Sequence, residues 1–454
     1  MKIVVVSAKH MDKETPKFHL VTYGCQMNKN DSERVAGLLE GLGFEATENE
    51  READFILLNT CSVRKSAEDR VFGKMQDLLK LKEKNPRLIV AVTGCMPGRD
   101  KAGAFKKKLK AVDLYFSTAD MVNLPRWIAE LRPDIVNSGD LVSDYLKIKP
   151  GRNPSAQAYV TIQTGCNNFC AYCVVPHSRG LEKNRPLKDI LEEVKELAER
   201  GVIEITLLGQ VVNAYKACDP EDFSAGNPYQ DHFAALLWEI NQIPGLQRVH
   251  WTAPHPNHMT DQVIDALTLP KQINFLHLPV QSGSNEVLRR MNRKYTAEKY
   301  LEIIQKVKAK RPGIALGTDI IVGFSGETPE QLEETVALFR AADFDISYHA
   351  EYSQRSGTLA AKIYQDDVAP DEKKRRWRVL QKLLEETSLR KNQAMVGKQA
   401  SVLVAKVEQG IASGNTSEMK LCCFRSDDLS LVGKIVSVKV IFAGEWQLIA
   451  NLLE

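Results

Sequence analysis

Three cysteines, Cys166, Cys170 and Cys173, stand within eight residues in the pattern C-x3-C-x2-C. Spacings of three and two let one loop bind three irons of a cubane iron–sulfur cluster and leave the fourth iron open to a ligand from outside the chain. A zinc ribbon would need a second pair of ligands close by, and the next cysteine is Cys218. The spacing therefore indicates a three-cysteine iron–sulfur centre, with a chance cluster of cysteines as the alternative.

Three more cysteines, Cys25, Cys61 and Cys95, share a position relative to the expected strands. Each follows an apolar stretch closely, at residues 18–23, 55–58 and 88–92. Because the carboxyl ends of parallel strands meet at one edge of a sheet, thiols placed in this way converge. Zinc usually takes four ligands, and no fourth Cys or His matches the set. A second cluster with one open iron is favoured, although four-cysteine ligation is commoner and three separately buried cysteines are the alternative.

The elements around these cysteines are expected to form an α/β protein of three parts. Residues 17–130 alternate apolar strands with helices, which indicates an N-terminal doubly wound parallel α/β domain, and residues 131–156 indicate a linker. Residues 157–353 repeat the alternation as six β/α units, which are too few for an eightfold barrel. A partial (β/α)6 TIM-like barrel is therefore expected, with domain bounds of 157–390. Residues 391–454 change to a period of two after Gly397, which predicts a small all-β module.

Two helices carry signatures of their own. Thr328 with Pro329 and Gln331 predicts a capped helix start. Residues 371–399 hold nine Lys or Arg against four Asp or Glu. Such a helix can follow phosphates, although a solvated helix face is the commoner meaning of a charge run. A second and weaker basic patch consists of Lys106, Lys107, Lys108 and Lys110.

The composition of the chain limits the class of protein to which these motifs can belong. The chain has 454 residues, is 43% hydrophobic, and has 61 Lys and Arg against 58 Asp and Glu. These values exclude a disordered or disulfide-stapled chain, and no apolar run reaches the roughly 18–20 residues of a membrane span. Residues 1–6 are too short an apolar stretch for a signal peptide, so a cytoplasmic protein with reduced thiols is expected. Cys218, Cys422 and Cys423 are expected to be bystanders.

Four short sequence motifs together make a more specific pattern than either cysteine set alone. They lie at residues 23–28, 59–64, 94–96 and 165–176. Together they resemble the radical S-adenosylmethionine (SAM) methylthiotransferases, from about residue 17 to the C-terminus. Within that family the motifs are most similar to the branch that acts on N(6)-isopentenyladenosine in tRNA. The branches for threonylcarbamoyladenosine in tRNA and for a ribosomal protein aspartate are the alternatives.

The resemblance implies two [4Fe-4S] clusters and SAM as cofactors. It places the radical cluster on Cys166, Cys170 and Cys173, and an auxiliary cluster on the N-terminal set of three cysteines. One SAM would donate a methyl group, and a second would yield the 5′-deoxyadenosyl radical that takes hydrogen from carbon 2 of the adenine at position 37. It also implies that the last part, residues 391–454, is an RNA-binding TRAM barrel.

Five residues are candidate SAM contacts by resemblance and position, and no catalytic side chain is assigned. They are Tyr172, Gly209, Gln281, Asp319 and Gly323. For each, an ordinary structural role is the alternative: aromatic packing, a turn glycine, or a buried hydrogen bond. Four positions depart from the family pattern and put loop shape in doubt: Val211, Ser325, Gln354 and Ser356.

The implied partners follow from the same resemblance. They are the anticodon stem-loop of tRNA, a reductase such as a flavodoxin, and a protein that donates sulfur or clusters. A monomer without membrane association is expected. A non-catalytic iron–sulfur protein that binds RNA is the competing hypothesis from another class, and the three-cysteine motif, with its cluster left open, argues against it.

Overall fold

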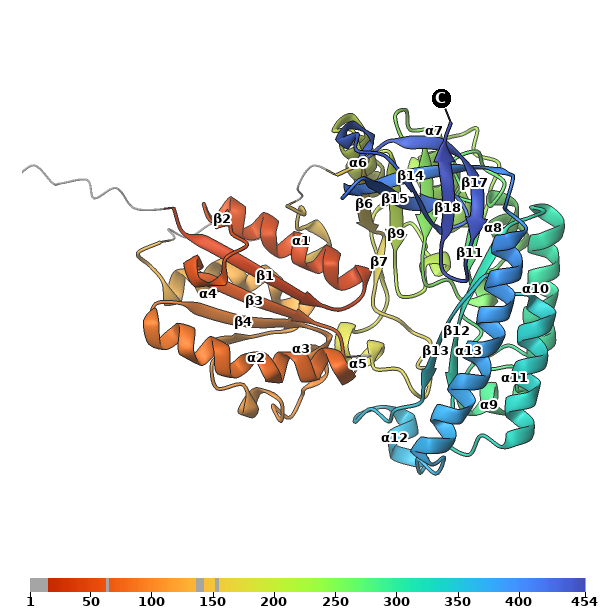
Figure 1. Ribbon diagram of the computed structural model, residues 1–454. Coiled ribbons are helices and arrows are strands. Elements are labelled where there is room, and N and C mark those ends of the chain that lie inside the picture. The colour runs from red at the N-terminus through yellow and green to blue at the C-terminus, as the bar shows by residue number, and fades with distance from the viewer. Residues whose placement is uncertain (1–14, 63–64, 136–142, 152–154, 454) are drawn as a thin grey trace, which may run out of the picture. The chain divides into compact units, whose positions relative to one another are not determined.

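The computed structural model describes residues 15–62, 65–135, 143–151 and 155–453. The chain divides into two compact units, Met1–Arg152 and Asn153–Glu454, and each is described by itself (Figure 1). In the described part of the chain, no helix is both long and apolar enough to cross a membrane.

The first unit is a parallel five-stranded sheet in the order β2-β1-β3-β4-β5. Its strands are β1 (Lys17–Tyr23), β2 (Glu45–Ala46), β3 (Phe55–Thr60), β4 (Ile89–Gly94) and β5 (Leu114–Tyr115). Its helices are α1 (Gln26–Gly41), α2 (Lys65–Lys84), α3 (Cys95–Arg99) and α4 (Leu124–Leu131).

Both faces of this sheet are covered, as a doubly wound fold requires. On β3, Phe55 and Leu57 belong to a core shared with α1 and α4, whereas Ile56 and Leu58 belong to a second core shared with α2. Alternate residues of a strand point to opposite faces, so a strand that is apolar throughout must be buried on both. The prediction of a doubly wound α/β domain is confirmed.

The segment at residues 143–151 also belongs to the first unit. Tyr145, Leu146 and Ile148 are buried in the core beside α1 and α4. Arg34 of α1 donates hydrogen bonds to the backbone carbonyls of all three. Part of the stretch expected to be a linker is therefore tied down by a buried guanidinium.

The second unit begins with six parallel strands in two sheets, β10-β9-β6 and β11-β12-β13. A parallel bridge between Val249 and Gln272 joins the edge strand β10 to the segment before β11. The strands are β6 (Gln157–Thr161), β9 (Glu204–Leu208), β10 (Arg248–Trp251), β11 (Phe275–His277), β12 (Ala315–Val322) and β13 (Ile346–Glu351), and a short hairpin pairs β7 (Gln163–Thr164) with β8 (Lys183–Asn184).

Helices pack around these strands (Figure 1), and most of them share one large apolar core with the strands. They are α5 (Val175–Arg179), α6 (Leu187–Glu199), α7 (His232–Gln242), α8 (Asp261–Ala266), α9 (Asn285–Arg290), α10 (Ala297–Lys310), α11 (Pro329–Ala342), α12 (Leu359–Ile363) and α13 (Pro370–Gln393). The N-terminus of α11 has the capping box predicted for Thr328 and Gln331. Six parallel strands with their crossover helices confirm the partial barrel.

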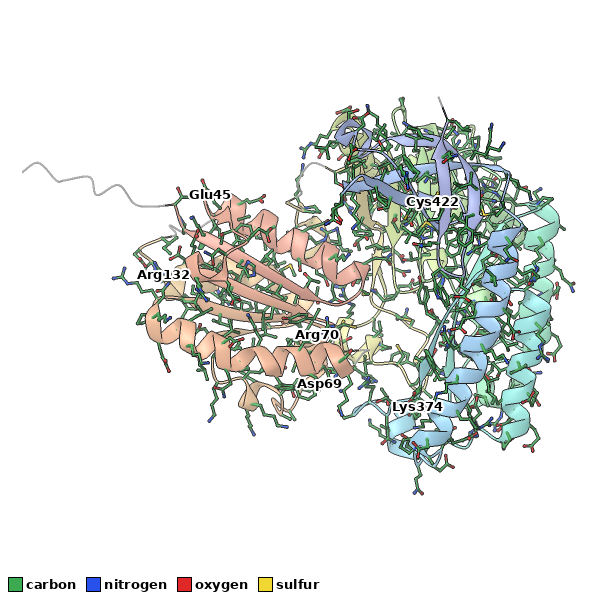
Figure 2. All side chains as sticks on the ribbon, viewed as in Figure 1. Glu45, Asp69, Arg70, Arg132, Lys374 and Cys422 are labelled. Carbon is green, nitrogen blue, oxygen red and sulfur yellow. The ribbon has the colours of Figure 1, made fainter. Side chains whose placement is uncertain are left out.

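A closed antiparallel barrel, in which β16 and β18 alone pair in parallel, completes the second unit. Its strands are β14 (Gln399–Glu408), β15 (Ile411–Thr416), β16 (Leu421–Arg425), β17 (Ile435–Ala443) and β18 (Leu448–Leu452). Cys422 is fully buried inside this barrel (Figure 2). Arg248 of β10 ties the barrel to the α/β part, because its guanidinium donates to the backbone oxygens of Ser401 and Asn415.

Candidate iron–sulfur and SAM site

The loop with Cys166, Cys170 and Cys173 runs from β7 to α5, just after the first barrel strand. Cys166 is buried and the other two cysteines are partly exposed. Gly165 precedes them with φ of +77°, and a Cβ atom there would lie 2.0 Å from the carbonyl oxygen of Leu181. A glycine is therefore required where the chain turns from the strand into the loop.

Each sulfur of this loop accepts a hydrogen bond from nitrogen. The backbone N–H of Asn168 donates to Cys166 Sγ at 3.4 Å, and that of Val175 donates to Cys173 Sγ at 3.5 Å. A guanidinium nitrogen of Arg293 donates to Cys170 Sγ at 3.7 Å. Donors on the ligand atoms are the usual outer shell of a metal-bound thiolate, so the donor set fits a cluster.

A segment some 120 residues further along the chain gives this loop its shape. The backbone carbonyl of Met291 accepts the N–H of Ala171 at 2.9 Å. The side-chain amide of Asn292 donates to the carbonyl oxygens of Phe169, at 2.9 Å, and Asn168, at 3.3 Å. Phe169 and Asn292 both have positive φ, at 47° and 57°. The residues from 291 to 293 thus support the cysteine loop directly, a role that sequence reasoning did not assign to them.

The surroundings of Cys166 and Cys173 favour the neutral thiol. Burial raises the pKa of Cys166, and it raises the pKa of Cys173 to about 12. A thiol with so high a pKa becomes a thiolate only when a metal replaces its proton. The loop therefore belongs to the class of sites in which metal binding and proton release are coupled.

The three N-terminal cysteines follow three neighbouring strands that are in register. Tyr23 of β1 pairs with Thr60 of β3, which in turn pairs with Gly94 of β4. Cys25 is the N-cap of α1, Cys61 directly follows β3, and Cys95 begins α3. All three therefore lie at one edge of the sheet, as the sequence predicted. Cys25 is exposed, whereas Cys61 and Cys95 are buried.

Amide side chains brace this sheet edge. Asn59 of β3 and Asn28 of α1 are fully buried, and they exchange hydrogen bonds of 2.8 and 3.0 Å. The thiol of Cys25 lies 3.3 Å from the side-chain oxygen of Asn28. Gly94 has φ of +101°, and a Cβ atom there would lie 2.4 Å from the carbonyl oxygen of Thr60. Close backbone packing therefore fixes where Cys61 and Cys95 emerge.

Within the described residues, no three His, Cys, Asp or Glu side chains are grouped so that they could hold a metal ion. A four-iron cluster is larger than a single ion, and its ligands are correspondingly further apart. The two cysteine sets are therefore matched to a cluster by their chemistry, their placement at strand ends and their hydrogen-bond donors. Their assignment as ligands remains a prediction.

The candidate SAM contacts lie toward the carboxyl ends of the barrel strands. Gln281 and Asp319 are neighbours, because the backbone N–H of Gln281 donates to the carbonyl oxygen of Asp319 at 2.8 Å. The Asp319 carboxylate lies 3.1 Å from a ring nitrogen of His277. Gly209 follows β9 in tight packing, and the Tyr172 ring packs against an apolar cluster. Structural roles account for these contacts, so SAM binding by these residues stays a prediction.

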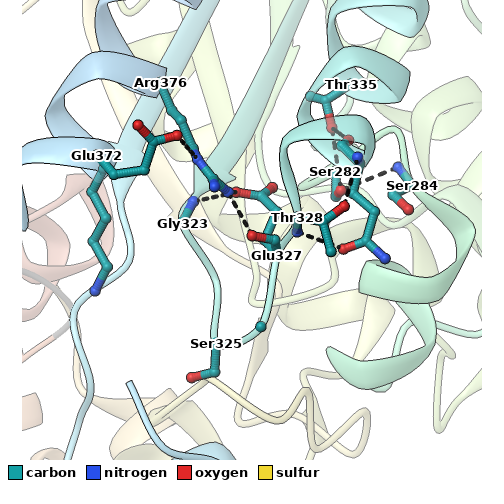
Figure 3. Close-up of polar contacts among 12 residues, drawn as sticks. Ser282, Ser284, Gly323, Ser325, Glu327, Thr328, Thr335, Glu372 and Arg376 are labelled. Carbon is teal, nitrogen blue, oxygen red and sulfur yellow. Dashed lines mark hydrogen bonds and ion pairs between the residues drawn. The ribbon is translucent and has the colours of Figure 1, made fainter. Parts of the chain in front are cut away.

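Gly323 is held by a buried ion pair between the loop after β12 and helix α13 (Figure 3). Its backbone N–H donates to the Glu327 carboxylate at 2.5 Å. Arg376 donates to the same carboxylate at 2.7 Å and to the Glu327 carbonyl oxygen at 2.8 Å. A Cβ atom on Gly323, where φ is +69°, would lie 2.4 Å from a side-chain carbon of Lys373. Helix α13 therefore sets the path of this loop.

The four departures from the family pattern lie outside both cysteine sets. Val211 is buried, and its N–H donates to the Gln163 side chain at 3.2 Å. Ser325 lies in the loop after Gly323, where its buried hydroxyl has no hydrogen-bond partner among the described residues (Figure 3). Gln354 donates to the carbonyl oxygen of Tyr364 at 3.2 Å.

Comparisons with known proteins agree with this geometry. Residues 160–339 match the model of the Radical SAM superfamily, and residues 17–117 match that of Uncharacterized protein family UPF0004. A radical SAM methyltransferase, TsrM from Kitasatospora setae, has a similar fold, with a TM-score of 0.55, 14% identity, and coverage of 88% of this chain and 77% of that chain. The partial barrel and its cysteine loop thus belong to a radical SAM domain, matched over residues 160–339.

Two curated proteins named tRNA-2-methylthio-N(6)-dimethylallyladenosine synthase match nearly the whole chain. The protein from Thermoanaerobacter sp. (strain X514) is 42% identical over 450 residues, which cover 96% of this chain and 93% of that protein. The protein from Moorella thermoacetica is 41% identical over 460 residues, which cover 98% of this chain and 100% of that protein. The chain belongs to the tRNA-2-methylthio-N(6)-dimethylallyladenosine synthase family of radical SAM methylthiotransferases.

Proposed function

We propose that this chain replaces the hydrogen on carbon 2 of N(6)-isopentenyladenosine, at position 37 of tRNA, with a methylthio group. The observation that carries the proposal is the match of 41–42% identity over nearly the full length of tRNA-2-methylthio-N(6)-dimethylallyladenosine synthases. SAM serves as methyl donor and as the source of the 5′-deoxyadenosyl radical. A radical is suited to this position, because an aromatic C–H bond offers no acidic proton for acid–base catalysis.

Two cysteine sets divide the work in this proposal. Cys166, Cys170 and Cys173 would hold the [4Fe-4S] cluster that supplies the electron for SAM cleavage. The sheet edge at Cys25, Cys61 and Cys95 would hold the second cluster, the site of sulfur handling. The protein's own task is to shape these loops and to exclude water.

The SAM pocket is the part of the proposal that depends on backbone shape. The candidate contacts are Tyr172, Gly209, Gln281, Asp319 and Gly323. The hydrogen bond from Gly323 to Glu327 fixes the peptide that would face SAM. The proposed domains are residues 17–130 for the auxiliary cluster, 157–390 for the radical SAM barrel and 391–454 for a TRAM barrel.

Helix α13 offers a basic stripe for the RNA. Arg375, Arg376, Arg390, Lys373 and Lys391 are all engaged in ion pairs. Lys374, Arg378 and Lys382, by contrast, are exposed and form no ion pair among the described residues. They are four residues apart and so share one face of the helix, with Lys374 near its N-terminal end (Figure 2). We call these three residues the α13 stripe.

The remaining partners are proposed on the same basis. They are the anticodon stem-loop of tRNA, a flavodoxin-type reductase and a donor of sulfur or clusters. The protein would act as a monomer in the cytoplasm.

Mass spectrometry of nucleosides tests the function. The reconstituted protein is incubated with SAM, a reductant and tRNA that carries N(6)-isopentenyladenosine, and the digested tRNA is analysed. We expect the 2-methylthio nucleoside with the wild-type chain and none with Cys166→Ala. Methylthiolation of threonylcarbamoyladenosine or of a ribosomal protein instead would overturn the substrate assignment. Iron binding without any SAM cleavage would favour the non-catalytic RNA-binding protein.

A further inference from the structure

Arg293 places a cation against the loop of three cysteines. Its guanidinium donates to Cys170 Sγ at 3.7 Å and lies over the ring of Tyr295, 5.6 Å from the centroid. Its Nε is buried and has no hydrogen-bond partner among the described residues. No carboxylate of the residues that the structure describes lies within ion-pair distance of Arg293. Withdrawing a cation from water in this position costs free energy unless a negatively charged group lies beside it.

The neighbouring His255 does not supply a positive charge beside Cys170. Burial, together with the charge of Arg293, lowers the pKa of His255 to about 3. His255 is therefore neutral near pH 7, and its ring packs against Tyr295. The positive charge beside Cys170 is thus carried by Arg293 itself.

The backbone of Arg293 is as well fixed as its side chain. The preceding residue, Asn292, donates to the carbonyl oxygens of Asn168 and Phe169 in the cysteine loop. The N–H of Arg293 donates to the carbonyl oxygen of Leu288, in the last turn of α9. The guanidinium is therefore anchored to the loop whose sulfur it contacts, and its distance from Cys170 is a built feature of the fold.

We propose that Arg293 is a positioning residue that acts through Cys170 to raise the reduction potential of the radical cluster. The inference rests on the proposed function, because it takes Cys170 as a cluster ligand. Reduction adds one negative charge to the cluster, and a nearby cation that donates to a ligand sulfur stabilises the reduced form more than the oxidised form. Without Arg293, the electron that cleaves SAM would be harder to deliver.

An EPR-monitored redox titration tests this role. The full-length chain with Cys25→Ala, Cys61→Ala and Cys95→Ala is the parent, so that the signal comes from the radical cluster alone. In Arg293→Gln we expect the reduced-to-oxidised ratio at a fixed potential to fall about tenfold, which is about 59 mV for one electron. Arg293→Lys keeps the charge and should restore most of the ratio. The exposed neighbour provides the control, Lys294→Gln, which should leave it unchanged.

Two results would overturn the inference. An unchanged midpoint in Arg293→Gln, with full iron and sulfide content, contradicts it. A normal midpoint with weakened SAM binding, read from the SAM-dependent change of the EPR signal, would make Arg293 a SAM ligand instead. If the glutamine variant loses iron, Arg293→Met decides by the same midpoint criterion. A parent chain that binds no cluster would refute the proposed function, a result separate from any effect of Arg293.

Discussion

At the residue scale, N–H groups reach sulfur atoms in both cysteine sets. In the loop that begins at Cys166, every sulfur accepts an N–H donor. At the N-terminal sheet edge, the thiol of Cys25 lies against the side-chain oxygen of Asn28. The sulfur of Cys25 also accepts the backbone N–H of Asn28. N–H donors lower the electron density on a ligand sulfur, so these surroundings suit metal-bound thiolates.

Replacing one cysteine at the sheet edge should separate the two halves of the reaction. Cys61→Ala is expected to retain SAM cleavage, because the loop from Cys166 to Cys173 is untouched, and to lose methylthio insertion. The measurements are 5′-deoxyadenosine by chromatography and modified nucleosides by mass spectrometry. Cys218→Ala, in an exposed loop, serves as the control and should keep both activities. A normal yield of methylthio product from Cys61→Ala would exclude an auxiliary cluster there.

At the element scale, helix α13 is bound to the loop after β12 by charge as well as by apolar packing. The side chains of Arg376 and Glu327 are 4% and 1% exposed, so this ion pair is largely withdrawn from water. Arg375, the next residue toward the N-terminus, is 55% exposed and pairs with Glu372. Arg376 pairs with Glu327 and Glu372 and is buried, whereas Arg375 pairs with Glu372 and is exposed. The two neighbours therefore allow a buried ion pair to be compared with an exposed one.

Arg376→Gln should therefore destabilise the protein far more than Arg375→Gln. Removing one partner of a buried pair leaves the other charge uncompensated and costs about 3–5 kcal/mol. An exposed pair contributes about 0–1 kcal/mol. Urea unfolding followed by circular dichroism measures both. Equal losses for the two variants would show that the Glu327 pair does not hold the loop.

At the scale of the whole molecule, charge is nearly balanced. The formal net charge is +3, so a uniform positive field cannot account for tRNA binding. Attraction to phosphates must come from local groups that are not already paired. The α13 stripe is such a group. Exposed Lys106, Lys107 and Lys108 in the first unit form a second patch of equal charge.

Replacing the α13 stripe, Lys374, Arg378 and Lys382, with alanine should weaken tRNA binding. Removal of each cation that neutralises a phosphate is expected to reduce the slope of log affinity against log salt by about 0.7–0.9. The control replaces Lys106, Lys107 and Lys108, which changes the net charge by the same amount. Fluorescence anisotropy at several salt concentrations gives both slopes. If the control triple lowers affinity as much as the stripe triple, binding follows bulk charge and the stripe has no special role.

Much of the fold was predictable because its signals are local. The apolar stretches around Cys61 and Cys95 predicted strands that are buried on both faces, and β3 and β4 are. Thr328 and Gln331 predicted the capping box that begins α11. The period-two pattern after Gly397 predicted an all-β module, and the strands of this module form a closed barrel. The positive charge of residues 371–399 was a poorer guide, because five of its cations are engaged in ion pairs that counting cannot show.

The sequence by itself determined the chemistry, because the types and spacing of the six cysteines are properties of the chain, and their positions after strands follow from short-range patterns. Only the tertiary structure decided which residues from distant parts of the chain contact the cysteine loop and the other candidate site residues. Asn292 and Arg293 reach Cys170 and its neighbours across more than 120 residues, and Arg376 reaches the loop of Gly323 across about 50. Such contacts depend on how helices pack onto strands, and no local propensity encodes the partner of a buried charge.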